Sequence, residues 1–283
     1  MADATRKRYL AAITLLLDFW HTYSAGPNAT RSLDIAVSEF VEHLYQEGDP
    51  LGLASDALAA LQYYHPDTIG KLKYSWKLTG LWRKLEPPNQ VVPFTNLTVL
   101  ALAGAAYDLG LLDITALLLL GFDRFLRSGE LFKLRVACLS VGAAKIVVTL
   151  TNTKTSKRKG IDEQVTVTSP LVIRMLKASI ADQPKSALIL RRSVSQCRVI
   201  FRHLLDLFDI NDGSYNFYSL RRGGATSFFF QTGSMDQTIV VGRWEHTSTA
   251  RIYINQSAAV AAEIKFTPEQ MLRMQDAAAL LNS

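Results

Sequence analysis

Apolar side chains recur at helical spacing through the first part of the chain. Between Arg6 and Tyr23 they return every three or four residues, which predicts a helix with one buried face. Residues 86–93 contain three prolines, which remove backbone donors and fix φ, so no helix continues there. We therefore expect a helical domain at 1–88, a linker, and a second domain at 89–283. Further helices of the first domain are predicted from Ser32 to Gly48, over 54–64 and over 68–84.

The apolar spacing changes twice in the second domain. Helical patterns over 97–109 and 112–125 give way to short β-branched segments at 136–140, 145–151 and 164–168, which indicate a small antiparallel sheet. A polar, basic hairpin loop joins the last two segments. The predicted fold class is mainly α with a small antiparallel β-sheet (α+β). Helical patterns resume at 171–181, 195–208, 220–233, 237–244, 249–257 and 268–281.

The most apolar stretch, residues 97–122, has about the length of a membrane span. It contains Asp108 and Asp113 with Gly110 between them, and carboxylates near a bilayer centre are costly. Two buried helices that meet at a turn explain the stretch better. The apolar run near the N-terminus ends at Asp18 and no small-residue cleavage site follows. We therefore expect an intracellular protein, in the nucleus or nucleoid if it acts on DNA.

Positive charge is concentrated in the second domain. The chain has 31 Lys and Arg against 25 Asp and Glu, a net charge of +6. Residues 1–88 hold 9 basic and 10 acidic side chains, so residues 89–283 hold 22 and 15. This excess permits a polyanionic partner without proving one. The motifs of nucleotide hydrolases, zinc proteases and serine hydrolases are absent from the sequence, and its two cysteines form no metal-binding cluster.

Two basic segments suit contact with phosphate. Lys154, Lys157, Arg158 and Lys159 lie on the predicted hairpin loop, where a solvated turn is the alternative. Arg221 and Arg222 begin a predicted helix and precede two glycines. Backbone donors and the helix dipole favour an anion at such a terminus, whereas close helix packing at the glycines is the alternative.

Five features follow one another in a fixed order along the second domain. Arg127 and Glu130 come at the end of an apolar helix, the Lys154 hairpin follows, and the Arg221 segment comes next. Trp244 then precedes Tyr253 by nine residues. In this order and spacing, residues from about 97 to 255 resemble the tyrosine recombinases, the phage-integrase family of DNA strand-exchange enzymes. The hairpin and the Arg-Arg-Gly-Gly-Ala-Thr segment look most like phage-type enzymes and the recombinases of eukaryotic mobile elements.

The resemblance implies a role for each matching residue. Arg127 and Arg221 match the two catalytic arginines, and Glu130 matches the acidic residue that supports the first. Lys154 matches the lysine of the family's strand hairpin. Trp244 matches the position where the family has His or Trp, and Tyr253 matches the nucleophile. Tyr218 stands where the family usually has His, and a neutral phenol with a pKa of about 10 is a poorer base near pH 7. Arg222 and Arg243, together with Lys157, Arg158 and Lys159, are expected to contact DNA.

The implied reaction needs no metal or other cofactor. Two guanidiniums match the oxygens of a phosphate at which charge develops, and Tyr253 forms a 3′-phosphotyrosyl bond. The expected partners are double-stranded DNA, clamped between a core-binding-like first domain and the catalytic domain, and further copies of the chain in a homotetramer. We also expect the amphipathic segment 268–281 to dock on a neighbouring subunit. The alternatives are a type IB topoisomerase-like nicking-closing enzyme and, because of Tyr218, an inert DNA-binding relative.

Overall fold

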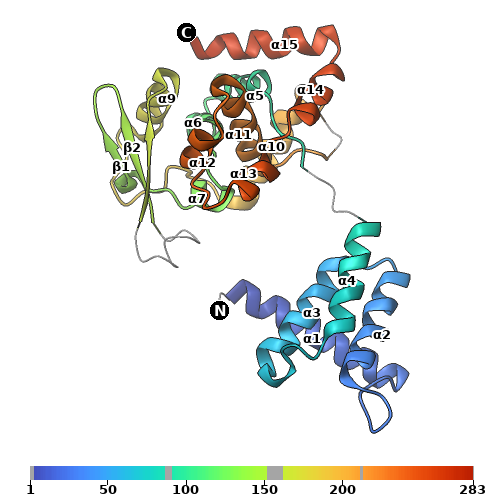
Figure 1. Ribbon diagram of the computed structural model, residues 1–283. Helices are drawn as coiled ribbons and strands as arrows, with labels where there is room; N and C mark the ends of the chain where they lie inside the picture. Colours follow the sequence, from blue (N-terminus) through green and yellow to red (C-terminus); the bar gives the residue numbers. More distant parts are fainter. Residues whose placement is uncertain (1–2, 87–90, 152–161, 211–212, 283) are drawn as a thin grey trace. The chain divides into compact units, whose positions relative to one another are not determined.

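The computed structural model describes residues 3–86, 91–151, 162–210 and 213–282. The chain divides into two compact units, Met1–Asn89 and Gln90–Ser283, and each has its own apolar core (Figure 1). In the part of the chain that the structure describes, no helix is long and apolar enough to cross a membrane.

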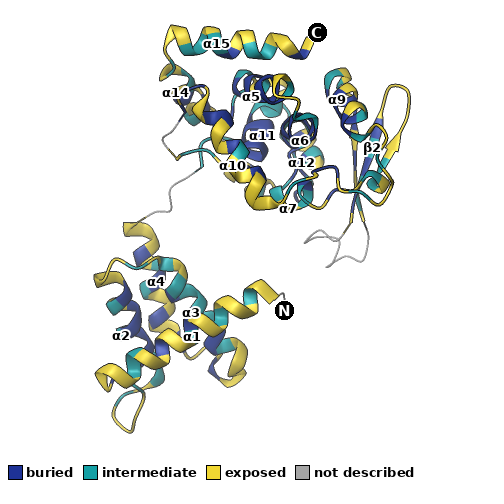
Figure 2. Ribbon diagram, turned by 180° about the vertical axis from the view of Figure 1, so that it is seen from behind, coloured by how far each residue is buried: buried dark blue, intermediate teal, exposed yellow. Residues whose placement is uncertain are grey.

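The first unit is a helical bundle. Its helices turn one apolar face inward, and Phe40, Leu58, Leu72 and Trp82 lie in the core that they enclose. The polar sides face outward and are drawn as exposed in Figure 2. The elements are α1 (Asp3–Tyr23), α2 (Leu33–Gln46), α3 (Leu51–Tyr64), the short 3₁₀ helix η1 (Pro66–Thr68) and α4 (Lys73–Leu85).

The N-terminus of α4 is capped by a side chain from α2. The Asp34 carboxylate accepts hydrogen bonds from the backbone N–H groups of Tyr74 and Ser75 at 2.8 and 2.9 Å, and from the Ser75 hydroxyl at 2.7 Å. Burial raises the pKa of Asp34, but these hydrogen bonds outweigh it and lower the pKa below its ordinary value. Because the residue before α4 is leucine and supplies no cap of its own, this contact fixes where the helix begins.

Two almost completely buried helices occupy the centre of the second unit. They are α5 (Asn96–Asp108) and α6 (Leu112–Asp123), which together make up the apolar stretch of the sequence. The turn between them needs the left-handed conformation of Gly110, whose φ is 68°. The stretch is therefore a hairpin of core helices, as its sequence predicts.

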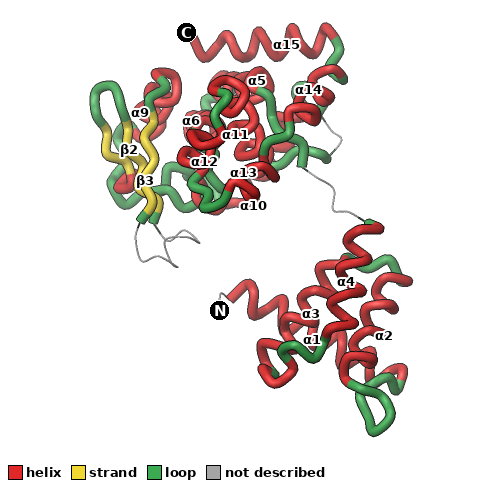
Figure 3. Tube along the Cα trace, in the orientation of Figure 1, coloured by secondary structure: helices red, strands yellow, loops and turns green. Residues whose placement is uncertain are grey.

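A small antiparallel sheet with the strand order β1-β2-β3 lies beside these helices (Figure 3). The strands are β1 (Leu139–Val141), β2 (Ile146–Leu150) and β3 (Glu163–Val167), and the pairing of β2 with β3 ends at Leu150 and Glu163. The predicted strand over 136–140 is wrong in its first half, which forms a 3₁₀ turn. There, the backbone N–H groups of Val136 and Ala137 donate outside the sheet, to carbonyls near residue 186.

The remaining helices surround α5 and α6. The single helix predicted over 249–257 is two helices, because the Asn255 side chain accepts a hydrogen bond from the Ala258 N–H at 3.0 Å and starts a new helix. With that correction, the predicted fold class, mainly α with a small antiparallel sheet, is confirmed. The elements are α7 (Ser128–Leu131), η2 (Val136–Cys138), α9 (Pro170–Ile180), α10 (Val194–Asp206), α11 (Tyr218–Thr232), α12 (Met235–Gly242), α13 (Thr247–Tyr253), α14 (Gln256–Ile264), α15 (Pro268–Ala279) and η3 (Leu280–Asn282).

The amphipathic tail packs on its own unit. Helix α15 lies along α5 so closely that a Cβ added to Gly104 would come within 1.8 Å of the carbonyl oxygen of Ala277 (Figure 1). Met274 and Leu281 are fully buried in the core of this unit. In the single chain its apolar face is covered by α5, and docking of this segment on a neighbouring subunit stays a prediction.

Candidate functional site

The first turn of α11 carries two of the predicted site residues. Tyr218 begins the helix and remains partly exposed, whereas Arg221 is completely buried. The Arg221 guanidinium donates to the carbonyl oxygen of Phe125, and to that of Gly242 at 3.0 Å. These carbonyls belong to the loop after α6 and to the end of α12, so one side chain connects three elements.

Two glycines allow α11 to approach its neighbours at backbone distance. A Cβ on Gly223 would lie 2.2 Å from the carbonyl oxygen of Phe94, and one on Gly224 would lie 2.0 Å from that of Phe122. No larger residue fits there without moving the backbone. The glycines therefore mark a close helix contact, as one interpretation of the sequence predicted. This contact also determines how deeply Arg221 is buried, because both lie on α11.

A buried carboxylate holds the other predicted catalytic arginine. Glu130 accepts the backbone N–H of Arg127 at 2.8 Å and its guanidinium at 2.7 Å, and it also accepts the Arg243 guanidinium at 2.7 Å. Burial raises the pKa of Glu130, but the charge of Arg243 and the hydrogen bonds from Arg127 outweigh it and lower the pKa. Glu130 therefore stays ionised and orients Arg127, whose side chain keeps 34% of its surface exposed.

An aromatic cluster surrounds Arg221. The centre of its guanidinium lies 4.8 Å from the ring centroid of Trp244 and 5.0 Å from that of Tyr253. The Trp244 and Tyr253 rings are 4.8 Å apart, the Tyr218 and Tyr253 rings are 5.5 Å apart, and Phe125 stacks on Trp244 at 6.3 Å. The structure thus brings four predicted site residues into contact: Tyr218 and Arg221 from α11, Trp244 from the loop between α12 and α13, and Tyr253 from α13.

The two tyrosines of this cluster are not equivalent. Burial raises the pKa of Tyr253, but a hydrogen bond from Tyr218 and the positive charges of Arg221 and Arg127 outweigh it and lower the pKa. The pKa of Tyr218 is raised, by burial and by donating its proton to that hydrogen bond. Of the two phenols, Tyr253 is therefore the one whose ionised form this site favours.

The backbone around Tyr253 is anchored to α11. The Thr226 hydroxyl donates to the carbonyl oxygen of Tyr253 at 3.2 Å and accepts the N–H of Asn255 at 3.1 Å. Arg222 donates to the carbonyl oxygen of Ile252 at 3.3 Å, and only 5% of its surface is exposed. Arg222 therefore helps to hold the end of α13 in place, and its contact with DNA stays a prediction.

Two buried N–H donors of the site have no hydrogen-bond acceptor in the part of the protein that the structure describes. Within the described residues, Arg221 Nε and Trp244 Nε1 are buried N–H groups without a hydrogen-bond partner. Buried polar groups are nearly always paired in folded proteins, so such donors indicate a ligand. Burial, and then the charges of Arg127 and Arg243, lower the pKa of Arg221 to about 10. It remains charged at neutral pH, and an anion would stabilise that charge.

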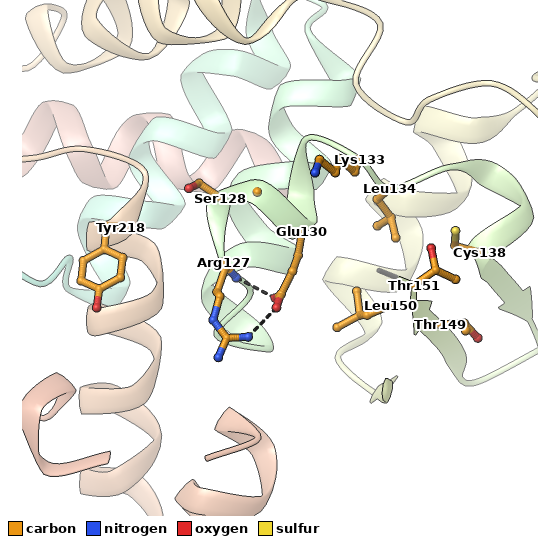
Figure 4. Close-up of a pocket in the computed structure, with 11 residues that line it drawn as sticks. Arg127, Ser128, Glu130, Lys133, Leu134, Cys138, Thr149, Leu150, Thr151 and Tyr218 are labelled. Atoms are coloured by element: carbon orange, nitrogen blue, oxygen red, sulfur yellow. Dashed lines mark hydrogen bonds and ion pairs between the residues drawn. The ribbon is translucent and has the colours of Figure 1, made fainter. Parts of the chain in front are cut away.

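A pocket of about 410 Å³ is lined by Arg127, Glu130 and Tyr218, but not by Arg221, Trp244 or Tyr253 (Figure 4). In this view Arg127 and Glu130 lie between Tyr218 on one side and the end of β2 on the other. It reaches Thr151, the last residue described before the segment that contains Lys154. The remaining lining residues are Ser128, Gly129, Lys133, Leu134, Cys138, Thr149 and Leu150.

Some predictions fall outside this geometry. Lys154, Lys157, Arg158 and Lys159 lie outside the described residues. The side chain of Arg243 is 8% exposed and paired with Glu130, and its predicted contact with DNA is not tested by this geometry. Sequence reasoning missed Thr226, although its place in the Arg-Arg-Gly-Gly-Ala-Thr segment was a usable signal. Among the described residues, no cluster of His, Cys, Asp and Glu could hold a metal ion.

Solved structures resemble this chain over nearly its whole length. XerH site-specific recombinase bound to difH substrate matches with a TM-score of 0.64 at 12% identity, over 92% of this chain and 78% of that one. The Tn1549 transposon integrase in complex with transposon right-end DNA gives 0.62 at 12% identity, over 94% of both chains. A lambda integrase tetramer bound to a Holliday junction gives 0.59 at 11% identity, over 90% and 72%. No protein-family model and no curated protein sequence matches the chain.

Proposed function

We propose that this chain, which has the fold of the tyrosine recombinases, cleaves and rejoins duplex DNA through a covalent bond between Tyr253 and a 3′ phosphate. The observation that carries the proposal is the environment of the Tyr253 phenol. Its ring lies 5.0 Å from the buried guanidinium of Arg221 and 5.5 Å from the ring of Tyr218, and its pKa is lowered. A phenol that ionises beside fixed positive charge is suited to attack a phosphodiester.

Arg127 and Arg221 bind the scissile phosphate. Attack on phosphorus places additional negative charge on the non-bridging oxygens, and guanidiniums present paired donors that match these oxygens. The partnerless N–H groups of Arg221 and Trp244, within the described part of the chain, are further donors for the same anion. Because the protein already holds these donors in position, little reorganisation accompanies the reaction.

The chemical step exchanges one phosphodiester for another. The Tyr253 phenolate attacks phosphorus, the bond from phosphorus to the 5′ oxygen breaks, and the 3′ phosphate remains on Tyr253. The 5′ oxygen leaves as a hydroxyl after it takes a proton, for which we assign Lys154 as the general acid. Attack by a 5′-hydroxyl, of the same or another strand, reverses the step and releases Tyr253. The bond energy is conserved, so no nucleotide is consumed.

The larger assembly follows from the same proposal. The first unit acts as a helical DNA clamp together with the catalytic unit, and four copies exchange strands between two DNA sites. The net charge of the second domain supports binding through phosphates, which weakens as the salt concentration rises. One of the structures that the chain resembles is itself a tetramer bound to a Holliday junction.

Covalent capture from a random pool tests this function for any target sequence. The full chain is incubated with a pool of duplex oligonucleotides of randomised sequence that carry nicks, so that a cleaved 5′ end diffuses away. Adducts are collected by precipitation with SDS and potassium, and the attached DNA is sequenced. We expect an adduct whose linked peptide contains Tyr253, and no adduct from Tyr253→Phe.

Other outcomes separate the alternatives. Relaxation of a supercoiled circle that carries one recovered site, without recombination between two such sites, would favour the topoisomerase-like activity. Specific binding without any adduct would favour an inert DNA-binding relative. An adduct that persists in Tyr253→Phe would refute Tyr253 as the nucleophile.

A further inference from the structure

Arg243 adopts a backbone conformation that favours glycine. It is the residue that ends α12, and its φ of 55° and ψ of 42° place it in the left-handed region. Glycine is the usual residue at such helix ends, because a side chain is disfavoured there. The guanidinium is nevertheless buried, with 8% of the side chain exposed. A strained residue with a buried charge indicates that the side chain itself has a use.

The Arg243 side chain lies between two carboxylates from different elements. Its guanidinium donates to Glu130 Oε2 at 2.7 Å, and its Nε lies 3.5 Å from Glu163 Oε2. Glu130 belongs to α7 and binds Arg127 through its other oxygen, whereas Glu163 begins β3. A continuous chain of charged contacts therefore runs from the first residue of β3 through Arg243 and Glu130 to Arg127.

The charges of this cluster do not balance. Arg127, Arg221 and Arg243 face Glu130 and Glu163, so the five groups together carry a net charge of +1 when all are ionised. Arg243 NH1 is buried and has no hydrogen-bond partner among the residues that the structure describes. A phosphodiester, with one negative charge, would neutralise the cluster. Arg243 thus adds a third guanidinium to the cluster that contains Arg127 and Arg221.

We propose that Arg243 is a positioning residue that acts through Glu130 to hold the Arg127 guanidinium against the scissile phosphate, and this inference rests on the proposed function. Without Arg243, Glu130 keeps its contacts with Arg127, whose backbone N–H also binds Oε2, but loses the only one of its three hydrogen bonds that comes from outside its own turn. The Glu130 carboxylate is then held less firmly, and the Arg127 guanidinium that it binds moves with it on the partly exposed side of the site. The contact with Glu163 extends the same restraint to the base of the β2–β3 hairpin.

Glycine at this position gives a discriminating variant. Arg243→Gly removes the side chain and suits the observed φ, so the backbone loses strain. Asp182→Gly is the matched control, because Asp182 also has a left-handed φ, of 60°, and is exposed after α9, outside the site. With a nicked duplex recovered from the randomised pool, we expect Arg243→Gly to form the Tyr253 adduct about 100-fold more slowly, as a displacement of about 1 Å would cause. Asp182→Gly is expected to react at the wild-type rate.

The second readout separates positioning from a structural role. A duplex with a methylphosphonate at the scissile position lacks the negative charge that Arg127 pairs with. On this neutral substrate we expect the deficit of Arg243→Gly, relative to wild type, to shrink to a few-fold. If the second unit of Arg243→Gly no longer shows a cooperative thermal unfolding transition, the variant is replaced by Arg243→Asn, because asparagine also tolerates this φ. Both adduct rates are then measured on Arg243→Asn.

Each unfavourable result has a distinct meaning. A wild-type rate for Arg243→Gly on the normal duplex would overturn the role of Arg243 while leaving the proposed function intact. An equal deficit on the charged and neutral substrates would show that Arg243 only supports the fold. If the wild-type chain forms no adduct with any member of the pool, the proposed function fails, and this inference fails with it.

Discussion

Replacing Gly224 with alanine tests whether the packing of α11 sets the geometry of the site. The added Cβ would lie 2.0 Å from the carbonyl oxygen of Phe122 and 2.9 Å from its carbonyl carbon. Ordinary contact begins at 3.4 Å, so the shortfall is 1.4 Å. Both atoms belong to the backbone and cannot rotate away. Helix α11 must therefore shift relative to α6, and Tyr218 and Arg221 shift with it.

The sign of the stability change decides whether this contact exists. In an open helix, Gly→Ala stabilises a protein by about 0.5–1 kcal/mol, because alanine loses less conformational freedom on folding. Overpacking a close contact costs about 1–3 kcal/mol or more. For Gly224→Ala the second effect dominates, and we expect a net loss of about 1–2 kcal/mol. A displacement of about 1 Å at the site would slow adduct formation on the order of 100-fold.

Gly80→Ala in α4 is the matched control, since nothing lies within 4 Å of the added Cβ and the substitution is in the other unit. Hydrogen exchange of the helix amides, read by mass spectrometry, reports the stability of each unit separately. We expect faster exchange in α11 for Gly224→Ala and slower exchange in α4 for Gly80→Ala. A Gly224→Ala protein that is stabilised and forms the adduct at the wild-type rate would refute the close packing and its link to the site.

Two further substitutions and a deletion probe the phenol pair, the indole and the tail. Tyr218→Phe removes the donor that lowers the pKa of Tyr253, so less phenolate forms at neutral pH. Adduct formation should fall on the order of 100-fold at pH 7 and recover as the pH is raised, and a pH-independent deficit would contradict this. Trp244→Phe keeps an aromatic ring but loses the Nε1–H, and should cleave about 10-fold more slowly with unchanged DNA affinity. An unchanged cleavage rate would exclude the indole as a donor. Deleting residues 268–283 uncovers α5 and removes the buried Met274, so the second unit should lose at least about 2 kcal/mol in denaturant unfolding. An unchanged unfolding midpoint would mean that the tail does not pack on its own chain.

Periodicity predicted the helices well because most of them bury one face. It failed where neighbouring segments decide the structure. The first half of the expected strand at 136–140 donates its backbone N–H groups outside the sheet, to residues about fifty positions later. The break at Asn255 is a side-chain cap inside a continuous helical pattern. The tail presents the amphipathic pattern of a docking helix, and that pattern does not say whether the covering surface belongs to the same chain.

The candidate site was predictable only in its most recognisable residues. Order and spacing pointed to Arg127, Arg221, Trp244 and Tyr253, and the structure brings all four to one place. The contacts that support them join distant positions, such as Glu130 with Arg243, which are 113 residues apart. The burial of Arg222 and Arg243 was not evident from the sequence either. Basic side chains usually lie on the surface, whereas both of these bind acceptors inside the protein.

The tyrosine at position 218 is consistent with catalysis once the direction of its hydrogen bond is considered. A general base at this position would have to accept the proton of Tyr253, which a neutral phenol does poorly. In the structure the two rings lie 5.5 Å apart, the pKa of Tyr253 is lowered and that of Tyr218 is raised. Hydrogen bonding from Tyr218 and the positive charges of Arg221 and Arg127 are the causes that lower the pKa of Tyr253. We therefore propose that Tyr218 favours the ionised form of Tyr253, so that the Tyr253 proton passes to solvent rather than to a base at position 218.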